Sequence, residues 1–300
     1  MNLNINTNLE SKFFEYCRRK CVNRVVNFQE FNLGKKTAEV LANILTYNQN
    51  IAHLKLSKNN FKDDGAQILM KILKSSLNII SLELASNDLT HKGGEIIFEA
   101  MLDQHSIISI DLSSLEGTNR NRLTADGVKK LEKVLKTNMY LEFLKLGGNS
   151  IKNEGLKYIL QGLNENTSLS YLDLSNNEIN SSGISYFCEH LENSNLIELD
   201  LSFNNISDEG VQNLSKCINK ISLNSLKKLN LERCKMSAEG LVVLFSVLQN
   251  NKKLEYLNLN KNNFSSDKLY YLRNYFYLVN LKEIKMSGCR LGDNGGKTEN

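Results

Sequence analysis

The feature that most constrains this chain is a leucine pattern that returns about every 28 residues. Leu172–Ile179 reads LDLSNNEI, and closely similar segments recur at Leu199–Ile206 (LDLSFNNI) and Leu257–Phe264 (LNLNKNNF). Repeats with a period of roughly 20–50 residues are typical of solenoids, because a single unit is too small to bury its own apolar face. The pattern therefore predicts a stack of similar units.

The period can be followed along most of the chain. The first apolar position of each unit falls at residues 51, 79, 107, 141, 169, 196, 226, 254 and 281, and a degenerate copy begins near residue 23. In each unit a Leu-x-Leu alternation predicts a short strand, and a following 3.6-residue period, as in Gly155-Leu156…Ile159-Leu160, predicts a helix. We predict an α/β fold, a right-handed solenoid with a concave parallel sheet and convex helices. Its expected parts are a helical cap over 1–22, about ten repeats over 23–291, and a disordered or truncated tail over 292–300.

Two further columns of residues support this division. A buried asparagine is expected where each strand turns, because a carboxamide both donates to and accepts from unpaired backbone groups. The column comprises Asn59, Asn87, Asn149, Asn177, Asn204 and Asn262, with Cys234 and Cys289 in the equivalent places. A serine or aspartate before the helical segment, as at Asp63, Ser207 and Ser237, is predicted to cap the helix.

The 28-residue period, the long helical half and the L-x-x-L-x-L-x-x-N core resemble the ribonuclease-inhibitor-like subclass of leucine-rich repeats, over residues 23–291. Relatives in that subclass include ribonuclease inhibitor, the GTPase-activating protein of Ran, tropomodulin-type actin regulators and the sensor arms of cytosolic immune receptors. The resemblance implies protein binding and does not choose among these roles.

Composition narrows the functional classes. With 37 Lys plus Arg against 33 Asp plus Glu, the net charge of +4 is too small to favour nucleic acid or an anionic membrane. No apolar run approaches the length of a membrane span, and six scattered cysteines suit a reducing compartment, so we expect a cytoplasmic protein. The four histidines fall in separate repeats without metal-ligand or nucleophile spacing. We therefore expect no enzyme activity, no metal, no cofactor and no small-molecule substrate.

The outward strand positions predict the binding surface. Numbering each unit from its first apolar residue, the third and fifth positions face outward and align across repeats. Aromatic anchors within a polar rim are typical of binding hot spots, and neighbouring carboxylates would favour a cationic partner. The predicted partner-binding residues are Phe143, Tyr171, Asp173, Asp200, Phe203 and Tyr256, with Asp111 and Lys145 beside them.

Three alternatives stay open. One step of 34 residues inserts Ser113–Asn119, and Arg120 and Arg122 beside it could serve a small-GTPase regulator resembling the Ran activator. The chain could instead be a subunit of a cytoskeletal or ciliary assembly, or a bacterial effector that binds a host protein. The last strand, Leu281–Met286, has no following helical pattern, so we expect either that the chain is a fragment or that docking or dimerisation occurs at that end.

Overall fold

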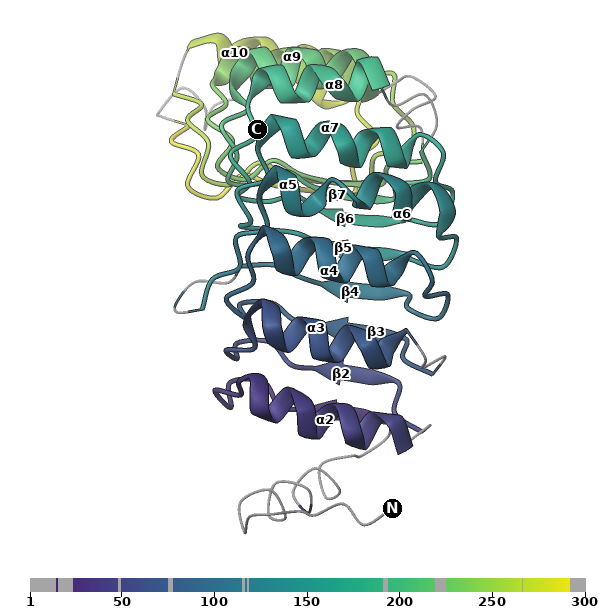
Figure 1. The fold of residues 1–300 in the computed structure, drawn as a ribbon. Coiled ribbons are helices and arrows are strands. Elements are labelled where there is room, and N and C mark those ends of the chain that lie inside the picture. The colour runs from purple at the N-terminus through teal and green to yellow at the C-terminus, as the bar shows by residue number, and fades with distance from the viewer. Residues whose placement is uncertain are drawn as a thin grey trace, which may run out of the picture.

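The computed structural model describes residue 15 and residues 24–47, 50–74, 78–114, 117, 119–190, 194–218, 225–265 and 267–291. Within them, ten parallel strands form one sheet in chain order, and the helices stack in a second layer against it (Figure 1). The strands are β1 Val25–Asn27, β2 His53–Lys55, β3 Ser81–Glu83, β4 Ser109–Asp111, β5 Phe143–Lys145, β6 Tyr171–Asp173, β7 Glu198–Asp200, β8 Lys228–Asn230, β9 Tyr256–Asn258 and β10 Glu283–Lys285. This is the predicted solenoid.

The helical layer is regular except in two repeats. Its α-helices and one 3-10 helix are α2 Lys35–Tyr47, α3 Lys62–Leu73, α4 His91–Met101, α5 Thr124–Val128, α6 Leu131–Thr137, α7 Lys152–Leu163, α8 Ser181–His190, α9 Ser207–Ile218, α10 Ala238–Leu248, η2 Asp267–Leu272 and α11 Arg273–Phe276. In the repeat that carries the insertion the helix is split into α5 and α6. In the ninth repeat a 3-10 turn and one α-turn replace it. In the other repeats from β1 to β8 one continuous helix follows each strand, and among the described residues no helix follows β10.

The strand register follows from the apolar pattern. The middle residue of each strand from β1 to β9, such as Leu54 or Leu172, is buried, while the residues on either side are more exposed. Neighbouring strands pair position by position, so that Leu144 lies opposite Leu172 and Leu172 opposite Leu199. The third and fifth positions of the repeat are therefore the outward positions, as predicted.

The asparagine column is buried and fully used in the middle of the solenoid. The Asn204 amide donates to the carbonyl oxygens of Leu201 and Leu174, each at 2.9 Å, and so joins its own repeat to the preceding one. Its Oδ1 accepts from the backbone N–H groups of Asn177 at 2.9 Å and Ile179 at 3.0 Å. One side chain thus serves four backbone groups that no strand or helix would satisfy.

The column continues through the irregular repeats. After the insertion, Asn121 takes the same place, with its amide donating to Leu84 and Leu112 at 3.0 Å each. Cys234 is fully buried in the column, and its Sγ donates to the Leu201 carbonyl at 3.3 Å. Burial raises the pKa of the Cys234 thiol to about 12, which keeps it protonated and able to donate. These contacts agree with the predicted structural role of the cysteine.

The capping prediction is confirmed at Ser237 and wrong at Asp63 and at Ser207, which is the first residue of α9. Ser237 caps α10, and its Oγ accepts from Glu239 N–H. Asp63 lies inside α3 instead. Its carboxylate accepts from the backbone N–H of Thr90 at 2.9 Å and from the Thr90 hydroxyl at 2.6 Å. Thr90 is itself the N-cap of α4, so the aspartate positions the cap of the next helix.

The same link between helices recurs in a later repeat. Asp208 in α9 accepts from the backbone and hydroxyl of Ser237 at 2.8 and 2.6 Å.

The helices also pack closely: a Cβ added at Gly94 in α4 would meet the Gly127 carbonyl oxygen of α5 at 2.8 Å. Only glycine allows the two backbones to approach this far.

The two ends carry the untested predictions. The cap predicted over 1–22, apart from Glu15, and the tail over 292–300 lie outside the described residues. β10 pairs with β9 and is half-exposed, as an edge strand would be, and docking there stays a prediction. None of the described helices has the length and apolar character needed to cross a membrane.

Candidate functional site

The outward side chains of the sheet form what we call the concave face, the third and fifth repeat positions of β2 to β10. Among the described residues this face carries four lysines and six carboxylates. Each lysine lies within ion-pair distance of one carboxylate: Lys55 and Glu83 at 3.4 Å, Lys145 and Asp111 at 3.8 Å, Lys228 and Glu198 at 3.0 Å, and Lys285 and Glu283 at 3.3 Å. The two carboxylates left over are Asp173 and Asp200.

Asp173 and Asp200, which we call the acidic pair, are direct neighbours. They lie opposite each other on β6 and β7, and adjacent strands are about 4.8 Å apart. Asp200 accepts from the Asn230 amide at 2.7 Å, a neutral donor that leaves its charge in place. Negative charge therefore accumulates on the concave face at this point.

The charge of the acidic pair is not needed by the backbone turn that follows. Asp173 accepts from Ser175 N–H at 2.8 Å, and Asp200 accepts from Ser202 N–H at the same distance. Asn230, at the same position in the next repeat, makes the equivalent bond to Glu232 N–H at 3.0 Å with its amide oxygen. A neutral asparagine thus does the same structural work, so the charge is an additional property of these positions.

Burial makes the Asp173 charge unfavourable. It raises the pKa of the Asp173 carboxyl above its ordinary value, and the nearby carboxylates of Asp200 and Asp111 raise it further, against hydrogen bonds from Ser175 that lower it. Gly147 packs closely against this group: an added Cβ would lie 2.7 Å from Ser175 Oγ and 3.2 Å from Asp173 Oδ2.

An aromatic pair lies next to the acidic pair. Phe143 begins β5 and Tyr171 begins β6, with their ring centroids 6.2 Å apart and their planes inclined by 35°. Phe143 is 41% exposed. Burial and then the negative charge of Asp173 raise the pKa of Tyr171, so its hydroxyl remains a donor. Four of the predicted residues are therefore brought together here.

Apolar exposure continues past the edge of the strands. Met139 and Tyr140 lie in the turn before β5, and Ile197 directly precedes β7; all three are exposed. The Thr167 hydroxyl contacts Met139 Sδ at 3.7 Å. The sequence analysis missed these residues because they stand outside the third and fifth positions. The sequence signal that could have identified them is an apolar residue next to the first leucine of a repeat, as at Tyr140 and Ile197.

The other predicted aromatics lie apart from this pair. Phe203 is beyond the end of β7, 42% exposed, with φ of 58°, a left-handed conformation that is strained for a bulky side chain. Asn176 adopts the same left-handed conformation at the equivalent position of the preceding repeat, where an asparagine suffers less backbone strain. Arg233 and Lys261 lie 5.7 and 5.8 Å from the Phe203 ring centroid. The ring is thus accompanied by two cations.

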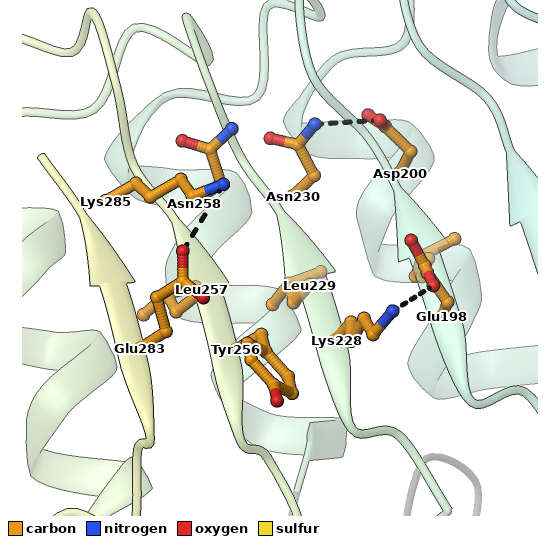
Figure 2. Close-up of a pocket in the computed structure, with 11 residues that line it drawn as sticks. Glu198, Asp200, Lys228, Leu229, Asn230, Tyr256, Leu257, Asn258, Glu283 and Lys285 are labelled. Atoms are coloured by element: carbon orange, nitrogen blue, oxygen red, sulfur yellow. Dashed lines mark hydrogen bonds and ion pairs between the residues drawn. The ribbon is translucent and has the colours of Figure 1, made fainter. Parts of the chain in front are cut away.

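A groove occupies the C-terminal part of the concave face. It has a volume of about 440 Å³ and lies over β7 to β10 (Figure 2). Tyr256 lines it, with the Lys228 ammonium 5.7 Å from the ring centroid. Figure 2 shows Lys228 directed towards Glu198 and the Asn230 amide directed towards Asp200. The groove therefore opens beside the acidic pair.

The predicted loop arginines lie at a separate place. Arg120 and Arg122 are exposed and line a hollow of about 280 Å³ together with Asn176 and Glu178. Arg120 Nε donates to Ser114 Oγ at 3.4 Å. Residues 115, 116 and 118 of the insertion lie outside the described part of the chain. The hollow is polar and is bounded by both charge signs.

Comparison with known proteins bears on the repeat itself. The family model described as "Leucine Rich repeat" matches residues 47–70, 137–160, 165–188, 192–215, 222–245 and 277–298. A solved structure titled "Leiomodin-1 Actin-Binding Site 2 (ABS2)" is similar over 52% of this chain and 90% of that chain, with 18% identity and a TM-score of 0.39. The comparison with curated proteins gives no match. The six matched repeats and the ten-stranded parallel sheet together identify the chain as a leucine-rich-repeat protein.

Proposed function

We propose that this protein is a non-catalytic recognition module that binds another protein through its concave face, as an inhibitor, an adaptor or an assembly subunit. Family membership supports protein binding in general. In the described residues, no group of three or more His, Cys, Asp or Glu side chains is arranged to hold a metal ion. The ribonuclease-inhibitor-like subclass and a cytoplasmic location remain predictions that fit this role.

The observation that carries the proposal is the aromatic pair on an otherwise polar sheet. A solvent-facing strand position gains little from an aromatic ring, whereas at an interface such a ring supplies a large apolar contact at low entropic cost. Phe143 and Tyr171 lie side by side on neighbouring strands beside charged side chains, and Met139, Tyr140 and Ile197 are exposed directly before β5 and β7. This is the arrangement of a hot spot within a polar rim.

The test is affinity capture from a lysate of the source cells. We expect the wild-type chain to retain a partner and Phe143→Ala/Tyr171→Ala to lose it. Tyr158→Ala is the matched control, because Tyr158 lies on α7 in the helical layer. Equal capture by all three proteins would contradict the proposal. The identity of the partner also separates an adaptor from a cytoskeletal or ciliary subunit and from a bacterial effector.

A second candidate is a small-GTPase regulator that uses the 113–122 loop. The supporting observation is that Arg120 and Arg122 both project at the exposed hollow, where an arginine could reach a bound nucleotide. Acceleration of GTP hydrolysis by the protein, lost in Arg120→Ala/Arg122→Ala, is the result this function requires. A hydrolysis rate unchanged by the wild-type protein, for a Ran-type GTPase and other small GTPases, removes the candidate.

A further inference from the structure

We propose that the acidic pair, Asp173 and Asp200, receives a cationic side chain from a basic segment of the partner, and that this side chain is preferentially arginine. The inference rests on the proposed function and specifies the chemistry of the partner. The occupant is a protein segment carrying exposed arginines, seated on the concave face over β5 to β7.

The first argument is charge complementarity. Each lysine of the concave face makes its ion pair with a carboxylate other than Asp173 or Asp200, although Lys145 also lies opposite Asp173 in the register of β5 and β6. The two carboxylates that remain are adjacent. Like charges opposite each other on a sheet are unfavourable, and here burial adds to the repulsion. A guanidinium group between Asp173 and Asp200 would relieve both effects.

The second argument comes from the repeat itself. Asparagine makes the same turn-closing bond at this strand position in three repeats, at Asn27, Asn230 and Asn258. The fold would therefore tolerate neutral residues at 173 and 200. Two adjacent charges that the fold does not need, and that repel each other, point to a ligand that does need them.

The third argument selects arginine over lysine. Tyr171 and Asp173 are on the same strand and the same face, two residues and roughly 6–7 Å apart. A planar guanidinium can lie over the Phe143–Tyr171 pair while its N–H groups reach a carboxylate, and an ammonium cannot do both as well.

The experiment uses the full chain and short fluorescein-labelled peptides in which serine alternates with arginine, lysine or glutamate. Fluorescence anisotropy should show the tightest binding for the arginine peptide and none for the glutamate peptide. Asp173→Asn/Asp200→Asn should weaken the arginine peptide by about tenfold, as expected for two partly exposed charge pairs. Asp111→Asn is the matched control, because it removes one charge from the same row where Lys145 already lies beside it. It should change affinity by less than about threefold.

Two outcomes would overturn the inference. One is an equal loss in Asp111→Asn and in the double variant, which would mean attraction by overall charge only. The other is absence of arginine-peptide binding by the wild-type protein, or unchanged binding by a double variant whose thermal melt matches the wild type. If Phe143→Ala/Tyr171→Ala still abolishes capture from lysate, the proposed function survives that failure. If peptide binding requires the acidic pair but Phe143→Ala/Tyr171→Ala captures the partner as well as the wild type does, the proposed function fails instead.

Discussion

At the scale of single residues, the fifth strand position combines a structural bond with a variable charge. An oxygen at this position accepts from the backbone two residues later whether it belongs to Asp173 or to Asn230. Substitution of aspartate by asparagine therefore removes charge and keeps the bond. This makes the effect of the charge on stability measurable by itself.

We predict that Asp173→Asn stabilises the protein at neutral pH by about 0.5 kcal/mol, the usual size of a cross-strand like-charge effect, or about 1–2 °C in Tm. The folded-state pKa of Asp173 is raised above the ordinary 3.8, so the native state binds this proton more tightly than the unfolded chain does. The associated stability is present below pH 3.8 and is lost as pH rises through the folded pKa. The advantage of the variant should therefore disappear as pH falls towards 3.8. Thermal melts of both proteins across pH 3.5–7 test this, and a constant difference would contradict it.

Cys234 offers a second test at this scale. Its thiol replaces an asparagine amide and donates to Leu201 O. We predict that Cys234→Ala costs about 1 kcal/mol, because the buried Leu201 carbonyl loses one of its two side-chain donors, and that Cys234→Asn costs less. Urea titrations of the two variants provide the comparison. Equal losses would show that the hydrogen bond is not what fixes this position.

At the scale of the elements, each helix is coupled to the next through its cap. Asp63 accepts two hydrogen bonds from Thr90, and Thr90 caps α4. The start of one helix thus depends on a side chain in the helix before it.

We predict that Asp63→Ala destabilises the protein by about 1–2 kcal/mol, through the lost bonds and a loosened cap. Asp64→Ala is the control, since Asp64 makes an exposed ion pair with Lys35 at 3.1 Å and should matter by less than about 0.5 kcal/mol. Chemical denaturation measures both. A larger loss in the control than in Asp63→Ala would refute the role assigned to this carboxylate.

The elements also show how far the sequence could be interpreted. Strand register and the asparagine column were predictable, because burial imposes a strict spacing on Leu172 or Asn204. The role of Asp63 was not, since its partner Thr90 is 27 residues away and neither residue is forced inward by the apolar pattern. The pairing of lysines on the concave face was equally hidden, because three of the four pairs join side chains from adjacent repeats. The predicted aromatic patch was therefore resolved into separate places only by the structure.

At the scale of the whole molecule, the asparagine column links each repeat to its neighbours at the turns that follow the strands. Asn177 donates to Leu146 O at 3.0 Å and accepts from the backbone N–H of Asn149 at 2.9 Å, both in the preceding repeat. In a solenoid each repeat contacts only its neighbours, so stability depends on each such interface. A break in the middle should separate two blocks.

We predict that Asn177→Ala costs about 3 kcal/mol or more and splits one unfolding transition into two, because several buried backbone groups lose their partners together. Urea unfolding followed by circular dichroism, with hydrogen exchange to assign the blocks, is the measurement. Asn176→Gly serves as the control, because Asn176 is exposed and glycine tolerates its φ of 51°. A single transition with an unchanged slope would show that the repeats remain cooperative without this side chain.

The column also has a consequence for a chain held under tension. Its amide side chains give way to sulfur at Cys234 and Cys289, both towards the C-terminal end, where a thiol offers one weak donor in place of two amide hydrogens. Pulled from its ends, the solenoid should unravel from those turns first, while the amide-linked repeats from Asn121 to Asn204 hold. The molecule would then lengthen in steps of one repeat and lose the groove before it loses the acidic pair.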